Sequence, residues 1–364
     1  MTVTTIPTIP HYEPAAPSQE DLDYANLAII DLSKYSTPEG RAELVDELRD
    51  AVRTYGFFYV INHGMTNEQT RRIFDIADVP FSQVSDEEKQ KYAGKMREVG
   101  TYQGYKLRKY WHINGGVRDQ IENYNINKQV HNKEHPVAVR PLMSEIETFT
   151  KHNHFNVLHP ILRLLATSLE LPEDTLTTIH GYEAPGDTWL RFMKYYPRSE
   201  EEEAQSGNIW LKGHTDFGSI TLLWSQPVSA LQIMTPEGKW KWVRHIENAL
   251  VVNSGDSLEF LSGGFYKPTI HRVVQPPSDQ RGYPRLGAFY FAVPDDNVRL
   301  VPLMQSPVIQ REGIKRRFTD EDAPTVEEYR KGRVAAYGQS QLKKSEEKGV
   351  EVEYIGKVLV KHYN

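Results

Sequence analysis

Three residues of this 364-residue chain have the types and the spacing of a metal site. His214 and Asp216 stand two apart in the segment GHTDFG, and His271 lies in the β-branched run KPTIHRVV. Residues two apart in extended backbone point to the same face, so His214 and Asp216 can approach one ion together. The flanking glycines, Gly213 and Gly218, would let the chain come close to that ion.

Two histidines and one carboxylate suit one kind of metal centre better than others. A closed structural zinc site needs a fourth protein ligand, whereas a facial set of three leaves positions open for oxygen and a co-substrate, as in non-haem Fe(II) oxygenases. The alternative is a polar turn between strands, because a chain with 13 histidines contains chance pairs. A second group is His152, His154 and His159, but His152 and His154 diverge on a helix, so these histidines are better explained as solvent-facing or as helix packing.

A cation and a phenol could complete the site at a distance from the metal. Arg285 opens RLGAFYF, the predicted strand after His271, and Tyr196 stands near the end of MKYYP. A buried arginine needs an anionic partner, and its guanidinium can hold a carboxylate through two hydrogen bonds. A metal at one end and Arg285 at the other suit a 2-oxo dicarboxylate, with Tyr196 as a further donor. A surface ion pair is the alternative for Arg285 alone.

The composition excludes several classes of protein. The net charge of −6, without a dense stripe of Lys and Arg, argues against a nucleic-acid binder. The absence of cysteine excludes disulfides, thiolate metal sites and a cysteine nucleophile. No segment reaches the roughly 20 apolar residues that span a bilayer, and the N-terminus lacks the features of a signal peptide. We therefore expect a cytoplasmic protein with a small-molecule substrate, and no nucleic acid, membrane or obligate protein partner.

The pattern of secondary structure changes near residue 188. Before it, helical spacings dominate, and the longest helical pattern, residues 141–172, contains Pro160, which predicts a kink or a split. After it, short apolar runs alternate with turns, which is typical of a sandwich or barrel. Thr325 begins a last amphipathic helix. Helices first, a barrel second and one helix last predict a single domain.

Seven segments, in order, resemble the Fe(II)/2-oxoglutarate dioxygenases of the isopenicillin-N-synthase-like family. They are LAIIDLS, GFFYVINHGM, VSDEEKQKYAG, KYYP, GHTDFGSITLL, ALVVNSGDSLEFLSGGFYKPTIHRVV and RLGAFYFA. The resemblance implies an α+β fold: a double-stranded β-helix (jelly-roll) core with N-terminal helices packed outside and a C-terminal helix. The expected parts of the single domain, residues 1–364, are a flexible tail (1–26), a mainly helical part (27–187), the jelly-roll core (188–310) and the C-terminal helix and tail (311–364).

The resemblance also implies roles for the residues singled out above. His214, Asp216 and His271 become the iron ligands and the catalytic centre, Arg285 the anchor of 2-oxoglutarate, and Tyr196 its helper. The cofactor and co-substrates become Fe(II), 2-oxoglutarate and O2. The family's reaction turns 2-oxoglutarate into succinate and CO2, and hydroxylation of the substrate is its usual outcome, with oxidative rearrangements as variants.

Two positions depart from the family pattern. The family's Arg-x-Ser is Arg285-Leu286-Gly287 here, which removes a hydroxyl from the co-substrate's far carboxylate, and its common Asn is Lys194. One neutral hydrogen bond contributes about 0.5–1.5 kcal/mol. These departures motivate an alternative function, an iron oxidase of the same fold that needs no 2-oxoglutarate. A second alternative is a non-catalytic barrel that retains a metal and binds a ligand.

Three residues are candidates for substrate binding. If Tyr196 faces the cavity, strand alternation turns Lys194 inward and Arg191 outward, although LRFMKYYP also resembles members whose early arginine reaches the substrate. We therefore keep both cations. Either one beside Phe217 suits an acidic or phenolic aromatic substrate, such as a methylated aromatic polyketide of secondary metabolism. The alternative is a solvated Lys194 and a Phe217 that belongs to the core.

Overall fold

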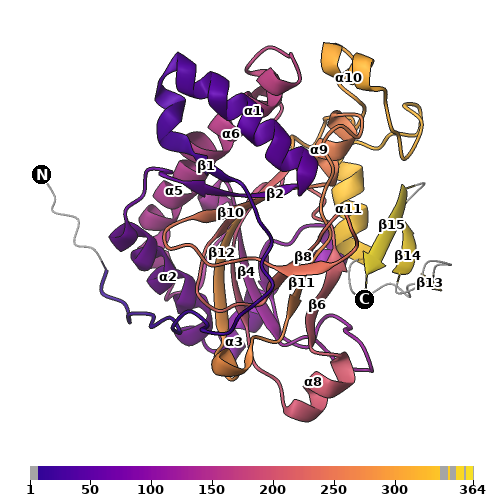
Figure 1. Cartoon of the computed structure of the whole chain (residues 1–364). Coiled ribbons are helices and arrows are strands. Elements are labelled where there is room, and N and C mark those ends of the chain that lie inside the picture. The colour runs from indigo at the N-terminus through magenta and orange to yellow at the C-terminus, as the bar shows by residue number, and fades with distance from the viewer. Residues whose placement is uncertain (1–6, 337–342, 345–349, 356–357, 364) are drawn as a thin grey trace, which may run out of the picture.

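Two β-sheets form the centre of the computed structural model, which describes residues 7–336, 343–344, 350–355 and 358–363 (Figure 1). Within these residues, eight strands form the larger sheet. Their order is β1 (Ile29–Asp31), β2 (Phe57–Ile61), β10 (Leu250–Ser254), β7 (Ile220–Trp224), β12 (Arg285–Ala292), β5 (Trp189–Tyr195), β4 (Ile121–Asn127) and β3 (Gly104–Lys106). All neighbours in it are antiparallel except β1 and β2.

The smaller sheet carries the strands on which the two histidines stand. Seven strands of the described residues form it, in the order β13 (Lys343–Lys344), β14 (Val350–Ile355), β15 (Val358–Tyr363), β6 (Ile209–His214), β11 (His271–Val274), β8 (Leu231–Met234) and β9 (Trp240–Trp242). The two sheets give the expected double-stranded β-helix architecture, so the predicted fold class is confirmed.

Helices cover the larger sheet on the face away from the smaller one (Figure 1). The α-helices are α1 (Pro38–Thr54), α2 (Asn67–Ser82), α3 (Asp86–Lys91), α4 (Met96–Val99), α5 (Met143–Lys151), α6 (His159–Ser168), α7 (Thr175–Thr178), α8 (Glu200–Ser206), α9 (Asp256–Leu261), α10 (Pro307–Glu312) and α11 (Val326–Ala336). Short 3-10 helices are η1 (Leu32–Ser36), η2 (Val130–Asn132), η3 (Arg140–Leu142) and η5 (Ser278–Gln280). None of the described helices is both long and apolar enough to cross a bilayer.

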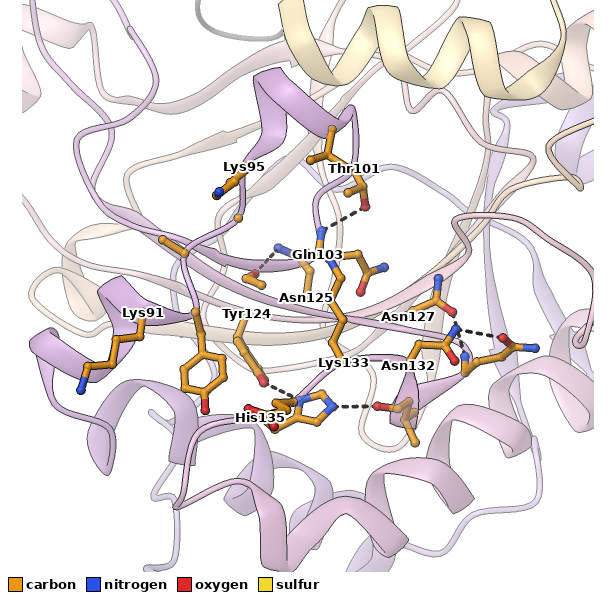
Figure 2. A pocket seen from close by; sticks show the side chains of 18 residues that line it. Lys91, Lys95, Thr101, Gln103, Tyr124, Asn125, Asn127, Asn132, Lys133 and His135 are labelled. Carbon is orange, nitrogen blue, oxygen red and sulfur yellow. Dashed lines mark hydrogen bonds between the residues drawn. The ribbon is translucent and has the colours of Figure 1, made fainter.

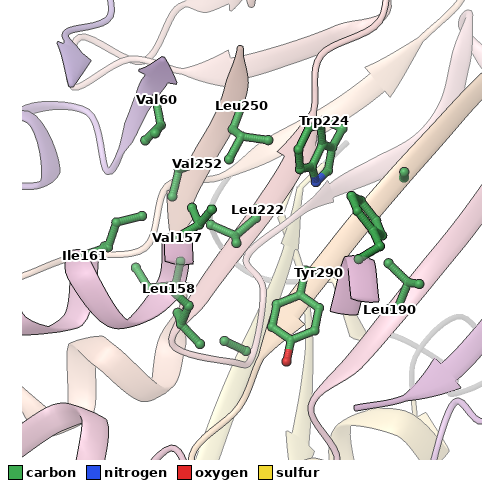
Figure 3. Close-up of a cluster of buried hydrophobic side chains, with 14 of the residues drawn as sticks. Val60, Val157, Leu158, Ile161, Leu190, Leu222, Trp224, Leu250, Val252 and Tyr290 are labelled. Carbon is green, nitrogen blue, oxygen red and sulfur yellow. The ribbon is translucent and has the colours of Figure 1, made fainter. Parts of the chain in front are cut away.

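The central strands of the larger sheet are buried on both faces, and each face belongs to a different core. Leu222 and Tyr290 point toward the helices and pack with Leu158 and Ile161 (Figure 3). Phe289, the neighbour of Tyr290 in β12, points into the barrel with Trp189. Successive side chains of a strand alternate between faces, so β5 and β12 present a regular inner row to the barrel interior.

The helix predicted over residues 141–172 is not split at Pro160 but contains a π-helical segment just before it. Between α5 and α6 the chain forms a π-helix, η4 (His152–Leu158), and Pro160 stands in the first turn of α6. Proline cannot donate the i→i−4 hydrogen bond and its ring crowds the preceding turn, and a π-bulge absorbs that mismatch. The π-helix histidines serve packing: His154 Nδ1 lies 2.8 Å from the Tyr290 hydroxyl oxygen.

The two ends of the described chain differ from the expected partition. Residues 7–26 are held on the surface, where Tyr12 N donates to Asp75 and Ala25 N to Trp242, rather than forming a loose tail. The part 27–187, expected to be mainly helical, contributes β1–β4 to the larger sheet. The expected C-terminal helix is α11, but β14 and β15 follow it, and Tyr363 pairs with Gly213. Residues 1–6 and 337–342 lie outside the described residues.

Trp224 connects the sheet to the π-helix and provides a test of this packing. Its indole Nε1 donates to Asn153 Oδ1 over 2.9 Å, and both side chains are fully buried. We expect Trp224→Phe to lower the free energy of unfolding by about 1–3 kcal/mol, because the buried amide oxygen loses its partner. Urea denaturation followed by circular dichroism measures this change. Tyr283→Phe, at a residue 51% exposed, is the control, and equal stabilities of both variants would contradict the prediction.

Candidate active site

His214, Asp216 and His271 meet in the barrel because of strand pairing. His214 ends β6 and His271 begins β11, and the two are direct partners in the antiparallel ladder. Their ring centroids are 4.4 Å apart. Asp216 follows β6 by two residues and turns back onto the same face. The three ligand atoms all lie within 4.8 Å of one another, so the predicted convergence is confirmed.

The distances between the ligand atoms fit one shared cation. Asp216 Oδ1 lies 3.7 Å from His214 Nε2 and 3.8 Å from His271 Nε2. Ligands at about 2.1 Å from one ion are roughly 3 Å apart when adjacent, so side-chain shifts below about 1 Å would complete the site. Within the described residues, this is the single group of His, Cys, Asp or Glu with metal-binding geometry.

Hydrogen bonds outside the triad orient each ligand. His214 Nδ1 donates to Lys212 O over 2.8 Å, and His271 Nδ1 donates to Thr269 O over 3.0 Å. With Nδ1 carrying the proton, Nε2 of each ring has the lone pair that a metal needs. On the carboxylate, Oδ2 of Asp216 accepts from Thr221 (2.6 Å) and Asn253 (2.9 Å), which leaves Oδ1 facing the two imidazoles.

The protonation states of the triad residues favour the binding of a metal cation. Burial, followed by the charge of His271, lowers the pKa of His214 to about 3, so its imidazole is neutral near pH 7. Burial raises the pKa of Asp216, but the two histidines and the donors Asn253 and Thr221 outweigh it, and the pKa lies below its usual value. A neutral imidazole and a charged carboxylate are the forms that bind a metal.

The loop after His214 is locked by backbone contacts. Asp256 N donates to Asp216 O over 2.7 Å, and a Cβ on Gly218 would lie 2.5 Å from Ala292 O. Only glycine fits there, and the close approach that requires it is to the backbone of β12, whereas we had expected an approach of Gly218 to the metal. Arg333, on α11, donates from Nη2 to Thr215 O over 2.9 Å. Helix α11 therefore supports the metal loop.

Arg285 lies buried in the inner row of β12, and no described residue gives it an anionic partner. It is 3% exposed, and its Nε has no hydrogen-bond partner among the described residues. Besides burial, the groups acting on its pKa are two tyrosines, Tyr195 and Tyr12. The Arg285 guanidinium lies 5.4 Å from the Tyr195 ring centroid. Burial raises the pKa of Tyr195 to about 12, whereas the guanidinium groups of Arg285 and Arg191 act to lower it.

The structure corrects the placement of Tyr196 and Lys194. Tyr196 donates its hydroxyl to Glu122 over 3.2 Å, and Lys194 forms a 2.6 Å ion pair with Asp78 of α2. Neither of them lines the cavities beside the triad and Arg285. Alternation along β5 begins at Tyr195, the ladder partner of Arg285, one residue earlier than expected.

Arg191 and Phe217 lie beside the triad. A cavity of about 50 Å³ adjoins His214 and Asp216, and aromatic rings form much of its wall. Trp189 stacks on Phe217 at 5.6 Å and on Phe291 at 4.8 Å. Arg191 donates from Nε to Asn125 Oδ1 over 2.6 Å. Its guanidinium carbon lies 4.8–5.6 Å from the centroids of the rings of Tyr102, Trp189 and Phe291.

A larger pocket lies apart from the triad, beside β3 and β4. Its volume is about 450 Å³, and polar side chains such as Gln103, Asn125, Asn132 and Lys133 line it (Figure 2). Tyr124 and His135 close its floor, with Tyr124 Oη 2.6 Å from His135 Nδ1. It contains no triad residue, although Asn125 reaches from its wall to Arg191.

Several residues of the site were missed from the sequence. Thr221 and Asn253 had a usable signal, since each is a polar residue next to a run of apolar residues, in ITLLW and LVVN. Tyr195 was missed because β5 is buried on both faces and shows no alternation of polarity. Arg333 had no signal, because a charged residue on an amphipathic helix is ordinarily solvated.

Removal of the single anionic ligand tests the metal site. We expect Asp216→Ala to weaken Fe(II) binding more than about a hundredfold, because changes to the partners of ligands alone cost tenfold to a hundredfold. Anaerobic titration calorimetry with Fe(II) measures the affinity. Asp46→Ala, a change at an exposed aspartate of α1, is the matched control, and unchanged Fe(II) affinity in Asp216→Ala would contradict the assignment.

Comparison with known proteins gives the same result as the geometry. Residues 27–145 match the family model described as non-haem dioxygenase in morphine synthesis N-terminal, and residues 189–294 match the 2OG-Fe(II) oxygenase superfamily. The second match contains the triad and Arg285.

Relatives and solved structures extend over most of the chain. Jasmonate-induced oxygenase 3 of Arabidopsis thaliana is 28% identical over 292 residues, 77% of this chain and 75% of that protein. Scopoletin 8-hydroxylase of the same plant is 26% identical over 313 residues, 82% of this chain and 79% of that protein. A full-length Neurospora crassa protein, crystallised in complex with alpha-KG, has a similar fold, with a TM-score of 0.74, 23% identity, and 89% and 100% of the two chains covered.

A facial His-Asp-His set, a barrel of the matching fold and two family models in sequence order lead to one assignment. The chain belongs to the 2OG-Fe(II) oxygenase superfamily, in its isopenicillin-N-synthase-like group, and is an Fe(II)- and 2-oxoglutarate-dependent dioxygenase.

Proposed function

We propose that this dioxygenase hydroxylates, or oxidatively rearranges, a small aromatic molecule that carries an acidic or phenolic group, and that each turnover converts 2-oxoglutarate into succinate and CO2. The observation that carries the proposal is the polar and aromatic wall beside the triad. Arg191 supplies a cation there, and Trp189, Phe217 and Phe291 supply flat apolar surfaces.

The triad residues would hold the iron, and Arg285 would hold the co-substrate. Bound Fe(II) and 2-oxoglutarate supply the activation of O2 when they are present. The chain's own contribution is position: His214, Asp216 and His271 present their ligand atoms on one side, and the buried guanidinium of Arg285 attracts the far carboxylate of 2-oxoglutarate. Tyr195 takes the part we expected of Tyr196, since its ring adjoins Arg285.

The charge and the lining of the cavity beside His214 and Asp216 support the proposed substrate class. An arginine among aromatic rings favours a planar anion, through its charge and through stacking. The cavity has a volume of about 50 Å³ and is lined by several aromatic rings, among them Trp189, Phe217 and Phe291, so an aromatic substrate would make mainly ring contacts there. One relative is named for the hydroxylation of scopoletin, and solved relatives hold thymine or JA, which supports a small organic substrate.

The co-substrate role of Arg285 has a direct test. We expect Arg285→Gln to raise the dissociation constant of 2-oxoglutarate at least about thirtyfold, because a buried carboxylate would lose its charged partner. Anaerobic calorimetry on the Fe(II)-loaded protein measures the affinity. Arg281→Gln, at an exposed position, is the control. Wild-type affinity in Arg285→Gln would remove Arg285 from this role.

The substrate class is tested with matched pairs of aromatic acids and their neutral methyl esters, with succinate measured beside product. We expect Arg191→Met to raise KM for the acid roughly tenfold or more and to change KM for the ester much less, because the lost interaction is ionic. Lys194→Met is the matched control, since Lys194 pairs with Asp78 outside the cavity. The reverse pattern would restore Lys194 as the substrate cation. Product without succinate would contradict the proposed reaction.

A further inference from the structure

The far-carboxylate end of the co-substrate site lacks a hydroxyl where the inner row of β12 would supply one. Gly287 follows Arg285 by two residues on the same face of the strand. A Cβ at this position would lie 2.6 Å and 3.1 Å from two atoms of the Phe289 ring. The ring therefore occupies the space of any side chain at 287, and a second donor beside Arg285 must come from another strand.

Ser225 stands where that donor is needed. The ladder between β12 and β7 pairs Phe289 with Leu223, and two further residues along each strand bring Gly287 opposite Ser225. Ser225 N still donates to Ala249 O over 3.0 Å, so the chain at 225 continues the sheet. By alternation from Leu223, which packs in the barrel core, the Ser225 side chain faces inward. Ser225 and Arg285 line the same small cavity.

In one tautomer of His245, the neighbours of Ser225 leave its hydroxyl proton for the cavity. Ile246 N donates to Ser225 Oγ over 3.3 Å, and His245 Nδ1 lies 2.7 Å from the same oxygen. A hydroxyl has two acceptor sites and one proton. When His245 carries its proton on Nδ1, both acceptor sites are filled, and the Ser225 O–H must donate elsewhere. Burial lowers the pKa of His245, so the ring is neutral and can adopt this tautomer.

The cavity wall also contains Gln226, Ser229 and Arg244, and the Arg244 guanidinium stacks on the Tyr24 ring, 4.0 Å from its centroid. The Gln226 side-chain amide is bonded to the backbone of Val228: Nε2 donates to Val228 O over 2.8 Å, and Oε1 accepts from Val228 N over 3.0 Å. Ser229 is the rival hydroxyl in this wall; its backbone N–H donates to Gln280 Oε1 over 2.7 Å, and the variant Ser229→Ala below tests its side chain.

We propose that Ser225, oriented by His245 and the Ile246 amide, donates a hydrogen bond to the far carboxylate of 2-oxoglutarate beside Arg285, and so replaces the hydroxyl that Gly287 cannot supply. The inference rests on the co-substrate role proposed for Arg285. Arg285 lies on β12 and Ser225 follows the neighbouring strand β7, so the two donors would reach the carboxylate from different directions. His245 acts through Ser225 and is a positioning residue.

The experiment compares two ligands that differ only in the far group. 2-Oxoglutarate carries the distal carboxylate, whereas 2-oxopentanoate has the same chain length and the same oxo-acid end without it. Their dissociation constants are measured by anaerobic calorimetry on Fe(II)-loaded wild type, Ser225→Ala, Ser229→Ala, His245→Leu and Arg285→Gln. Fe(II) affinity and thermal unfolding of each variant show that the fold and the metal site are retained.

We expect Ser225→Ala to weaken 2-oxoglutarate roughly tenfold, as for a hydrogen bond to a charged group, and to leave 2-oxopentanoate unchanged. His245→Leu should weaken 2-oxoglutarate less, and Ser229→Ala should have no effect. Wild-type affinity in Ser225→Ala with a weakened Arg285→Gln overturns this inference alone. Equal weakening of both ligands by Ser225→Ala also overturns it, because the contact then lies elsewhere. Unchanged affinity in Arg285→Gln overturns the co-substrate anchor itself, and an effect confined to Ser229→Ala transfers the role to Ser229.

Discussion

The cross-strand pair of His214 and His271 is the constraint on which the rest of the site depends. Antiparallel pairing fixes two imidazoles side by side on the inner face of the smaller sheet. The backbone then needs only one tight loop to return Asp216 to the same point, and close contacts with Gly218 and with the start of α9 hold that loop. The metal geometry is therefore a property of the sheet register, and a shift of one residue between β6 and β11 would abolish it.

The larger sheet contributes charged side chains to the site from alternate positions of its strands. β5 and β12 are buried on both faces, and their inner rows carry Arg191, Tyr195 and Arg285. Buried cations on a sheet are costly unless an anion meets them. Under the proposed function, the far carboxylate of 2-oxoglutarate supplies that anion for Arg285. The rings around Arg191 lower that cost through cation–π contacts.

The sequence predicted the parts that depend on residue type and order, and it failed where only geometry decides. The triad and the jelly roll followed from spacing and from motifs in family order. Tyr196 and Lys194 were assigned to the wrong face because a doubly buried strand, WLRFMKY, offers no alternation of polarity from which to count. The backbone pairing of Arg285 with Tyr195 shows which residues of β5 face the barrel. This pairing joins residues that are far apart in the sequence, so the sequence of β5 alone cannot reveal it. The strands after α11 were missed because their partner, the edge of β6, lies more than a hundred residues earlier.

The contact between α11 and the metal loop has a consequence for how the protein is made. Tyr329 donates to Asp256 over 2.7 Å, Asp256 N binds Asp216 O, and Arg333 binds Thr215 O, so α11 braces the loop that carries the carboxylate ligand. During synthesis these residues leave the ribosome more than a hundred positions after Asp216. A nascent chain that already contains all three ligand residues therefore still lacks the contacts of Tyr329 and Arg333 that hold the loop of Asp216.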